Sequence, residues 1–305
     1  RYEQHDLLRL AGFQELDTTL DFKDGDKVQN ARHQLALHYL ALVHEVRKTR
    51  DYCSLDCEWL HLRDALVYAA GQASKDPSLL SRLVRGLADY WSVRGMYREW
   101  ASWSRLAVDI SAETGWLGAE GSHLMSLGHA YFELGEIRQA IECFERARAI
   151  ARTVGDQEAG GRCLSDLGMA CAALGEVEQA VTYLQTALEI IRETGDRNAE
   201  GNALGNLGMA HFQQGHTRQA IQYYEQALAT ARSIGNRRAE GSFLGNLGNA
   251  FYCLGYMQEA LSYHGQALII AREIGNRRGE AADLSNIGLV HTAQGNIAQA
   301  IECHE

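Results

Sequence analysis

A segment of eight residues recurs along this chain at a spacing of 40 residues, and this period restricts the possible folds more than any other feature. The octapeptide LGNLGNAF at 244–251 corresponds to LGNLGMAH at 204–211, and related octapeptides begin at positions 124, 164 and 284. A period of roughly 20 to 50 residues is typical of repeat proteins, in which one supersecondary unit buries its apolar face against neighbouring copies. The sequence therefore predicts an elongated stack of similar units.

Each 40-residue unit is predicted to be a hairpin of two helices. In segment 217–234 the apolar residues recur at the spacing of one broad helix face, and Gly215 separates this helix from the preceding one. Gly235 follows the second helix, where a glycine readily adopts the left-handed conformation that ends a helix. Asn236 comes next and can cap the following helix with its side chain. The chain has one proline in 305 residues, which favours an almost entirely helical protein.

Columns of small residues indicate where helices cross. Gly208 and Ala220 each belong to a column that repeats every 40 residues. We expect both at the crossing of two helices, because a larger side chain would hold the backbones apart. The glycines of the Gly208 column lie inside predicted helices, and the chain has no G-x-x-x-x-G-K-[ST] sequence, so we do not interpret them as phosphate-binding loops.

Composition argues against several classes of function. The net charge is −10, and residues 115–305 contain 14 basic and 22 acidic residues, which argues against a nucleic-acid partner. No apolar run approaches the roughly 18 residues that span a membrane, so no membrane partner is expected. The seven scattered cysteines favour a reducing compartment and a cytoplasmic location. No catalytic spacing is readable, and we expect neither catalytic residues nor a cofactor nor a metal in this chain.

The repeat resembles the tetratricopeptide repeat (TPR) family. The matching residues are Leu207, Gly208, His211, Gly215, Ala220, Tyr224 and Ala227. The usual unit has about 34 residues, so a 40-residue unit implies longer helices. Gly235 also stands where the family pattern has a proline. The resemblance implies an all-α, right-handed superhelical solenoid of helical hairpins. The 40-residue variety with G-[DN]-R at the junction resembles repeats of bacterial signalling ATPases and of animal Pins-type scaffold proteins.

The predicted organisation is an N-terminal helical adaptor followed by repeats. Residues 1–74 do not follow the 40-residue period and should form helices at 31–49 and 59–72, with a polar loop at 17–30. Residues 75–305 should form the solenoid. Its predicted units are 75–114 (divergent), 115–154, 155–194, 195–234, 235–274 and 275–305 (truncated). Because the chain starts without Met and stops within a repeat, we expect it to be a fragment of a longer protein.

The N-terminal segment carries a second resemblance. The residues His5, Asp6, Leu7, Leu8 and Arg9 resemble the H-D-L-[LV]-R motif of bacterial STAND-type (NB-ARC) regulators, and segment 58–70 resembles the helical arm that follows it. In those proteins the motif ends the ATPase module, and the arm leads into tetratricopeptide repeats. The resemblance implies an upstream nucleotide-binding module that the repeats could contact within one protein. The simpler interpretation is that the tryptophan-rich residues before 115 cap the first repeat.

The family pattern also implies a binding groove on the concave side. In that family the groove is lined by five positions of the first helix, which are the second, fifth, ninth, twelfth and thirteenth. These positions are counted here from Gly161, Gly201 and Gly241. The predicted groove residues are Arg162, Met169, Asn202, Met209, Phe212, Gln213, Ser242, Asn249 and Tyr252. Amide groups beside methionine and aromatic side chains suit an extended peptide or a helix. Phe212 and Tyr252 could instead pack on the next repeat, and Arg162 could pair with a local glutamate.

Other polar columns have structural interpretations. We expect Asn206, Asn246 and Asn286 to bond the neighbouring helix, because buried polar groups need partners. The arginines at 197, 237 and 277 precede glutamates by three residues, which predicts weak, exposed ion pairs at helix starts rather than a phosphate site. His264, His291 and His304 fall where repeats pack together, with Cys253 and Cys303 possible neighbours. Buried, hydrogen-bonded histidines are favoured there over a metal site.

These features predict a domain that binds proteins or peptides and is not an enzyme by itself. The leading hypothesis is a ligand-sensing, autoinhibitory arm of a bacterial signalling ATPase. One alternative is a passive scaffold that holds a partner peptide. Another is a set of regulatory repeats attached to an effector such as a protease or a DNA-binding regulator. The identity of the ligand does not follow from the sequence, because related folds bind unrelated partners.

Overall fold

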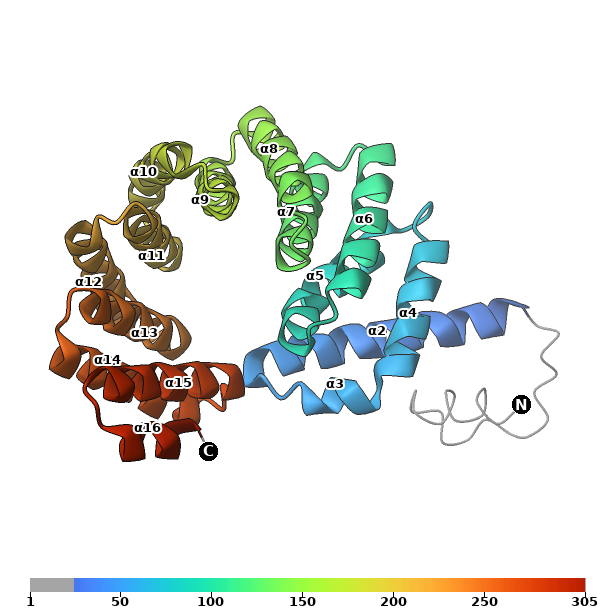
Figure 1. Ribbon diagram of the computed structural model, residues 1–305. Helices are drawn as coiled ribbons and strands as arrows, with labels where there is room; N and C mark the ends of the chain where they lie inside the picture. Colours follow the sequence, from blue (N-terminus) through green and yellow to red (C-terminus); the bar gives the residue numbers. More distant parts are fainter. Residues whose placement is uncertain (1–24, 305) are drawn as a thin grey trace. The chain divides into compact units, whose positions relative to one another are not determined.

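The computed structural model describes the backbone of residues 25–304 and the side chains of residues 28–303, and all regular secondary structure in this part of the chain is helical (Figure 1). The chain divides into two compact units, residues 1–150 and 151–305. Each unit is built from consecutive helices that pack against their neighbours in sequence. The expected all-α fold of sequential helical hairpins is therefore confirmed.

The first unit begins with three helices that do not follow the repeat, and hairpins follow them. Its helices are α2 (Gly25–Thr49), α3 (Cys53–Cys57), α4 (Trp59–Gly71), α5 (Pro77–Arg94), α6 (Tyr97–Glu113), α7 (Leu117–Glu133) and α8 (Ile137–Val154), the last of which ends just beyond the boundary. Helix α2 packs on α4 and α5, and α5 and α6 form the first hairpin. Trp100, which stands in the alanine column, is buried and donates a hydrogen bond to Ser126 of α7 at 2.7 Å.

The structure corrects the sequence-based description of the adaptor in two places. Residues 25–30, which we predicted as part of a polar loop, belong to α2, and residues 17–24 lie outside the described part. Gln29 and Asn30 are exposed, so their polarity reflects a solvent-facing helix turn rather than a loop. The short helix α3 was not predicted. Asp56 of this helix accepts hydrogen bonds from Tyr90 at 3.1 Å and from Arg94 at 2.9 Å, both in α5. Glu58, which follows α3, accepts a hydrogen bond from Tyr39 of α2 at 2.8 Å.

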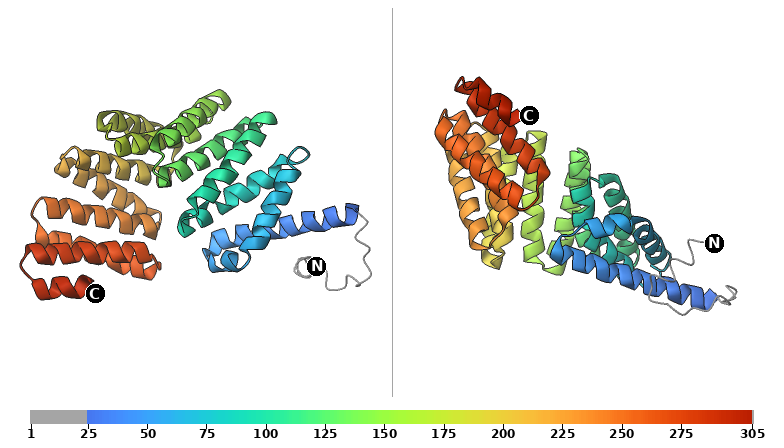
Figure 2. Two further views of the ribbon diagram at one scale, coloured as in Figure 1. Left: turned by 45° about the vertical axis from the view of Figure 1, so that its right-hand side comes forward. Right: turned by 90° about the horizontal axis from the view of Figure 1, so that it is seen from below.

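The second unit consists of four hairpins in chain order. Its helices are α9 (Gln157–Leu174), α10 (Val177–Thr194), α11 (Arg197–Gln213), α12 (Thr217–Ser233), α13 (Arg237–Cys253), α14 (Met257–Glu273), α15 (Arg277–Ala293) and α16 (Ile297–His304). Figure 2 shows these hairpins stacked side by side. The helix bounds agree with the predicted hairpin pattern to within a few residues. The adaptor and repeat boundaries themselves stay predictions.

Short local signals begin and end these helices. Gly235 has φ of +68°, and the backbone N–H of Asn236 reaches back to the carbonyl of Ala231 at 2.9 Å, which closes α12 in the way expected for a left-handed glycine. The side chain of Asn236 then accepts a hydrogen bond from the backbone N–H of Ala239 at 3.1 Å and caps α13. Asp196 caps α11 in the same way. The predicted glycine stop and Asn or Asp start are confirmed here.

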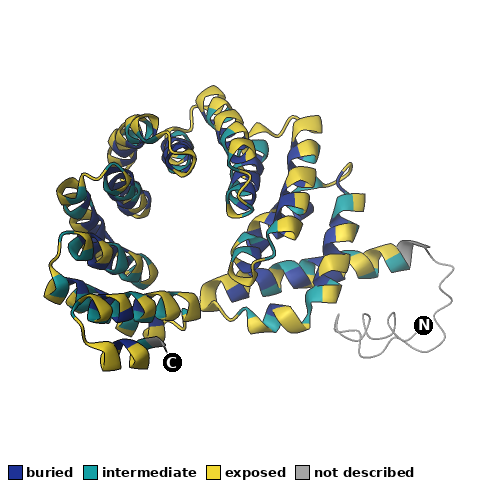
Figure 3. Ribbon diagram, viewed as in Figure 1, coloured by how far each residue is buried: buried dark blue, intermediate teal, exposed yellow. Residues whose placement is uncertain are grey.

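The predicted close approach of helices at the glycine column is also confirmed. A Cβ atom added to Gly208 would lie 2.6 Å from the ring of Tyr224, which is buried in the facing helix α12. At the equivalent place in the previous hairpin, Leu184 lies against Gly168. Burying a side chain of this size stabilises a fold by roughly 1.5 to 3 kcal/mol. The buried residues lie between the helices, and the exposed ones face away from them, as Figure 3 shows.

Contacts between hairpins show which helices lie on the inner side of the second unit. The first helix of each hairpin contacts the first helix of the next, α9 with α11, α11 with α13 and α13 with α15. Among the described residues, the second helices of successive hairpins have at most marginal contact with one another. A stack whose first helices lie closer together than its second helices curves toward the first helices. The concave side is therefore formed by α9, α11, α13 and α15.

Candidate functional site

One stripe of residues runs along each first helix of the second unit and remains outside the buried core. It contains positions two, six, nine and thirteen, counted from residues 161, 201, 241 and 281, and these positions share one helix face because they are four, three and four residues apart. All sixteen side chains are exposed or partly exposed. We call this set the first-helix stripe. Its members are Arg162, Asp166, Met169, Ala173, Asn202, Asn206, Met209, Gln213, Ser242, Asn246, Asn249, Cys253, Ala282, Asn286, Leu289 and Ala293.

Seven of the nine predicted groove residues belong to this stripe, and Phe212 and Tyr252 flank it at position twelve. Both flanking rings are half-buried, and Phe212 packs against the buried core of the unit. Position five differs from the sequence-based pattern. Gly205 is buried, and a Cβ atom there would collide with the ring of Phe243 from α13. At Gly205 this position therefore joins α11 to α13 instead of facing a ligand, whereas Ser285 at the same position of α15 is exposed.

Leu289 is a surface residue that the sequence analysis missed. Its side chain is 50% exposed, and it occupies position nine of α15, the same position as Met169 and Met209. The predicted groove residues came only from α9, α11 and α13. Extending the same 40-residue column by one unit would have found Leu289.

The one arginine of the stripe is already paired. Arg162 contacts the carboxylate of Glu158 one turn earlier in α9 and lies 3.6 Å from Asp196 Oδ2, the residue that caps α11. The sequence left open whether this arginine would meet a local glutamate or a ligand. The structure shows the local pair and adds an aspartate from the next hairpin. The positive charge of Arg162 is therefore neutralised by the protein itself.

Most asparagine side chains of the stripe, unlike Arg162, have no hydrogen-bond partner within the described part of the protein. Asn202, Asn246, Asn249 and Asn286 have no hydrogen-bond partner among residues 28–303, although Asn246 and Asn286 are half-buried. Asn206 alone follows the prediction for its column, because its Nδ2 donates to Ser165 Oγ of α9 at 3.4 Å. The concave side thus carries several amide groups whose hydrogen-bonding capacity the protein does not use.

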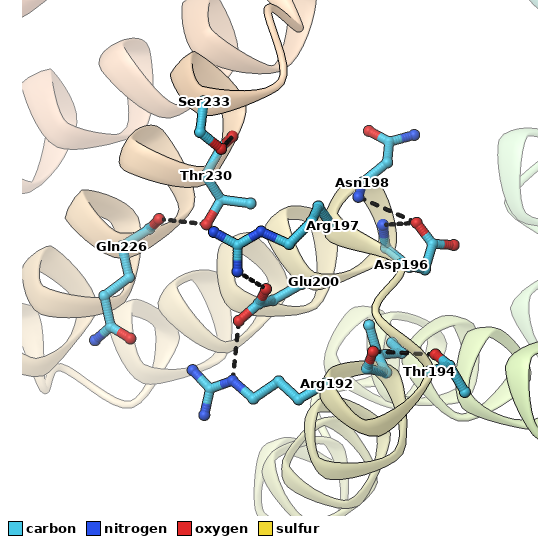
Figure 4. Close-up of polar contacts among 11 residues, drawn as sticks. Arg192, Thr194, Asp196, Arg197, Asn198, Glu200, Gln226, Thr230 and Ser233 are labelled. Carbon is cyan, nitrogen blue, oxygen red and sulfur yellow. Dashed lines mark hydrogen bonds and ion pairs between the residues drawn. The ribbon is translucent and has the colours of Figure 1, made fainter.

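An ion-pair cluster connects α11, α13 and α15 to the preceding second helix, and Figure 4 shows it at the start of α11. Glu200 of α11 accepts hydrogen bonds from Arg192 of α10 at 2.9 Å and from Arg197 at 2.5 Å. Glu200 is only 7% exposed. The prediction of exposed ion pairs at the helix starts is therefore wrong for this carboxylate, which is buried. The arginine from the preceding second helix was not predicted, because a 40-residue column does not show which columns meet.

The same arrangement recurs at the next junction. Glu240 accepts hydrogen bonds from Arg232 at 2.8 Å and from Arg237 at 2.6 Å. Burial by itself would raise the pKa of Glu240, but the two guanidinium groups outweigh it and hold the pKa below the ordinary value. This clamp, which Glu280 repeats with Arg272 and Arg277, ties α11, α13 and α15 to the second helix before each of them.

The histidines of the repeat interfaces serve packing. His264 of α14 is 1% exposed, lies against Gly248, and shares a hydrogen bond of 3.2 Å with Asp283 Oδ1 of α15. This agrees with the buried, hydrogen-bonded interpretation. His291 is half-buried, but its Nδ1 has no hydrogen-bond partner among the described residues, so the hydrogen-bonded interpretation is wrong for it. The side chain of His304 lies outside the described set. Within the described residues, no three His, Cys, Asp or Glu side chains are arranged to hold a metal ion.

Comparison with family models identifies the repeat. The model described as Tetratricopeptide repeat matches residues 120–193, 163–233 and 240–305, which together make up more than half of the chain. The chain belongs to the tetratricopeptide repeat family. TPR proteins present helical hairpins of the kind seen here, so the resemblance inferred from the glycine and alanine columns is confirmed. No curated protein matches this TPR chain. No helix of the described part is long and apolar enough to cross a bilayer.

Solved structures resemble this TPR fold at low sequence identity. A Rap protein complexed with Competence and Sporulation Factor has a TM-score of 0.62 at 16% identity, over 89% of this chain and 74% of that chain. BtubC from P. vanneervenii has a TM-score of 0.59 at 21% identity, over 68% of this chain and 87% of that chain. A STAND protein with a tetratricopeptide repeat sensor from Pyrococcus horikoshii has a TM-score of 0.58 at 19% identity, over 99% of this chain and 45% of that chain. At these identities the likeness concerns the fold alone.

Proposed function

We propose that this TPR domain binds an extended segment of a peptide or protein along the concave side of residues 151–305. The observation that carries the proposal is the set of unpaired amides at Asn202, Asn246, Asn249 and Asn286, beside the partly exposed ring of Tyr252. Amide side chains can pair with a peptide main chain, and thioether and aromatic groups adapt to apolar side chains. The Rap protein complexed with Competence and Sporulation Factor supports the proposal by analogy of fold.

The test is a binding measurement with a matched control. Peptides are selected on the 305-residue chain from a random display library, and the Kd of one selected peptide is measured by fluorescence polarisation. Replacing Asn202, Asn249 and Tyr252 together by Ala should weaken binding by about tenfold or more, since each hydrogen bond contributes about 0.5 to 1.5 kcal/mol. Replacing Gln185 and Gln222 by Ala removes amides from exposed positions of the second helices and should leave the Kd unchanged.

Circular dichroism must show that both variants remain helical. A peptide that binds both variants equally well would contradict the proposed concave site. The tryptophan-rich segment before residue 115 would then be the next surface to examine.

We further propose that the domain acts as the ligand-sensing, autoinhibitory arm of a cytoplasmic signalling ATPase. The 40-residue period, the HDLLR sequence at 5–9 and the similar fold of the STAND sensor support this role, although HDLLR lies outside the described residues. Binding of a ligand in the concave side would change how the arm contacts an upstream nucleotide-binding module.

The complete reading frame tests the sensor role. A Walker A motif upstream, with ATP hydrolysis that responds to a peptide selected on the TPR domain, is the expected result. A reading frame without that motif would contradict it. A passive scaffold would then be favoured, or regulatory repeats attached to a protease or a DNA-binding regulator if such a domain is encoded.

A further inference from the structure

We infer that the ligand of the concave side is an extended peptide segment of low charge, which is recognised through its main chain and its apolar side chains. Acidic groups or a terminal carboxylate would not be the recognised features. This inference rests on the proposed function and specifies the class of ligand. It follows from three properties of the first-helix stripe, which are its charge, its free amides and its apolar residues.

The stripe carries almost no usable charge. Its sixteen positions contain one arginine and one aspartate, both in α9, although residues 115–305 contain 14 basic and 22 acidic residues overall. Arg162 is held between Glu158 and Asp196, so an acidic ligand would have to compete with two carboxylates for it. Helices α11, α13 and α15 contribute no charged side chain to the stripe. A charged ligand would lose hydration on this surface without gaining an opposite charge.

The free amides match the hydrogen-bonding groups of a peptide main chain. An asparagine side chain offers two N–H donors and one carbonyl acceptor, which can pair with the C=O and N–H of a peptide unit. Asn246 and Asn286 occupy position six of neighbouring first helices, α13 and α15, and both are half-buried and unpaired. Asn249 lies one turn after Asn246 on the same face. A ligand strand that crosses the stacked helices would meet these amides in succession.

The stripe also contains apolar side chains beside these amides. Position nine holds Met169, Met209, Asn249 and Leu289 in successive first helices. Methionine is flexible and polarizable, so it packs against differently shaped apolar side chains. Leu289 is half-exposed, and the half-buried ring of Tyr252 flanks the stripe. These groups favour a ligand whose side chains are apolar and whose main chain is accessible.

Library selection on the 305-residue chain tests the inference, with rounds at low and at high ionic strength. We expect the enriched peptides to have few charged residues and to bind with a Kd that changes less than about twofold with salt, because screening acts on charges. Replacing Asn246 and Asn286 by Ala should weaken binding about tenfold. The combined Gln185→Ala and Gln222→Ala control should leave the Kd unchanged. Arg162→Ala should weaken binding far less than the loss of the two asparagines, because Arg162 is already paired with Glu158 and Asp196.

A second measurement avoids any dependence on variant stability. The selected peptide is synthesised with N-methyl groups at alternate main-chain amides, and separately with an amidated C-terminus, and both are tested on the unchanged protein. N-methylation should weaken binding about tenfold or more, and amidation should have no effect.

The outcomes separate this inference from the proposed function. Enrichment of acidic peptides, a Kd that rises with salt and a loss of binding in Arg162→Ala would overturn the low-charge inference while leaving a concave site in place. If no selected peptide is weakened by the combined change of Asn202, Asn249 and Tyr252 to Ala, the proposed function fails as well.

Discussion

At the scale of single residues, glycines of this protein differ in what surrounds them. Gly208 lies against the ring of Tyr224, whereas Gly265 in α14 has nothing within 4 Å of the place where a Cβ atom would lie. We predict that Gly208→Ala lowers the free energy of unfolding by about 1 to 3 kcal/mol, because the core cannot accept the extra methyl group. Gly265→Ala should raise it by about 0.5 to 1 kcal/mol, because alanine favours the helix. Urea titrations followed by circular dichroism measure both, and equal effects of the two changes would contradict the crossing geometry.

We predict that His123 of α7 makes the stability of the first unit sensitive to pH. Burial, together with the nearby Arg85, lowers the pKa of His123 to about 4, and its Nε2 lies 2.8 Å from Ser81 Oγ. In the unfolded chain this imidazole has the ordinary pKa of about 6.5. Between about pH 4 and 6.5 the unfolded chain therefore binds more protons than the folded chain. Stability is therefore complete above this interval and decreases as the pH falls through it, by up to about 3 kcal/mol.

His123→Gln is expected to remove this part of the pH dependence. All five tryptophans lie before residue 117, so their fluorescence during urea unfolding at pH 7 and pH 5 reports on the first unit. A variant that loses as much stability on acidification as the unchanged protein would show that other groups are responsible.

At the scale of elements, the ion-pair clamp at Glu200, Glu240 and Glu280 couples α10, α12 and α14 to the first helix that follows each of them. Replacing the buried Glu240 by Ala removes hydrogen bonds from Arg232 and Arg237, and we predict a loss of about 1 to 2 kcal/mol. Glu189→Ala, at an exposed position of α10, is the control and should change stability little. Because the pKa of Glu240 is lowered in the folded chain, its contribution is present at neutral pH and is lost as the pH falls below the ordinary carboxyl pKa.

Hydrogen exchange can locate this effect. We expect faster exchange in the last turn of α12 and the first turn of α13 of Glu240→Ala, and little change in the control. Unchanged protection at that junction would contradict the role of the clamp in placing α13.

At the scale of the molecule, the second unit is a chain of neighbour contacts. Helix α15 packs against α13, α14 and α16, so the last hairpin has no extensive contact with α9 to α12 among the described residues. A shortened chain that ends at Ile274 should therefore keep α9 to α12 folded, with circular dichroism per residue close to that of the full chain. Hydrogen exchange should become faster mainly in α13 and α14, because these helices lose their contacts with α15. Loss of protection throughout α9 to α12 would show that the unit folds all-or-none.

The fold was largely predictable because its signals are local or strictly periodic. Gly235 and Asn236 determine a helix end and a helix start through backbone conformation and capping, which act over a few residues. The Gly208 column predicted the helix crossing because close packing requires a small residue there. Prediction failed at residues 25–30 and at α3, where no period applies and polar exposed helix turns resemble a loop.

The candidate site was predicted only in part. By itself, the sequence determined the hairpins and their repetition, because these depend on spacing along one chain. The groove-facing positions were an expectation from the resemblance to tetratricopeptide repeats. Only the tertiary structure decided that Asp196 and Glu158 both meet Arg162, that Glu200 is buried between two arginines and that Asn246 and Asn286 stay unpaired. These outcomes depend on distances between side chains of different helices, and such distances are set by how neighbouring hairpins pack.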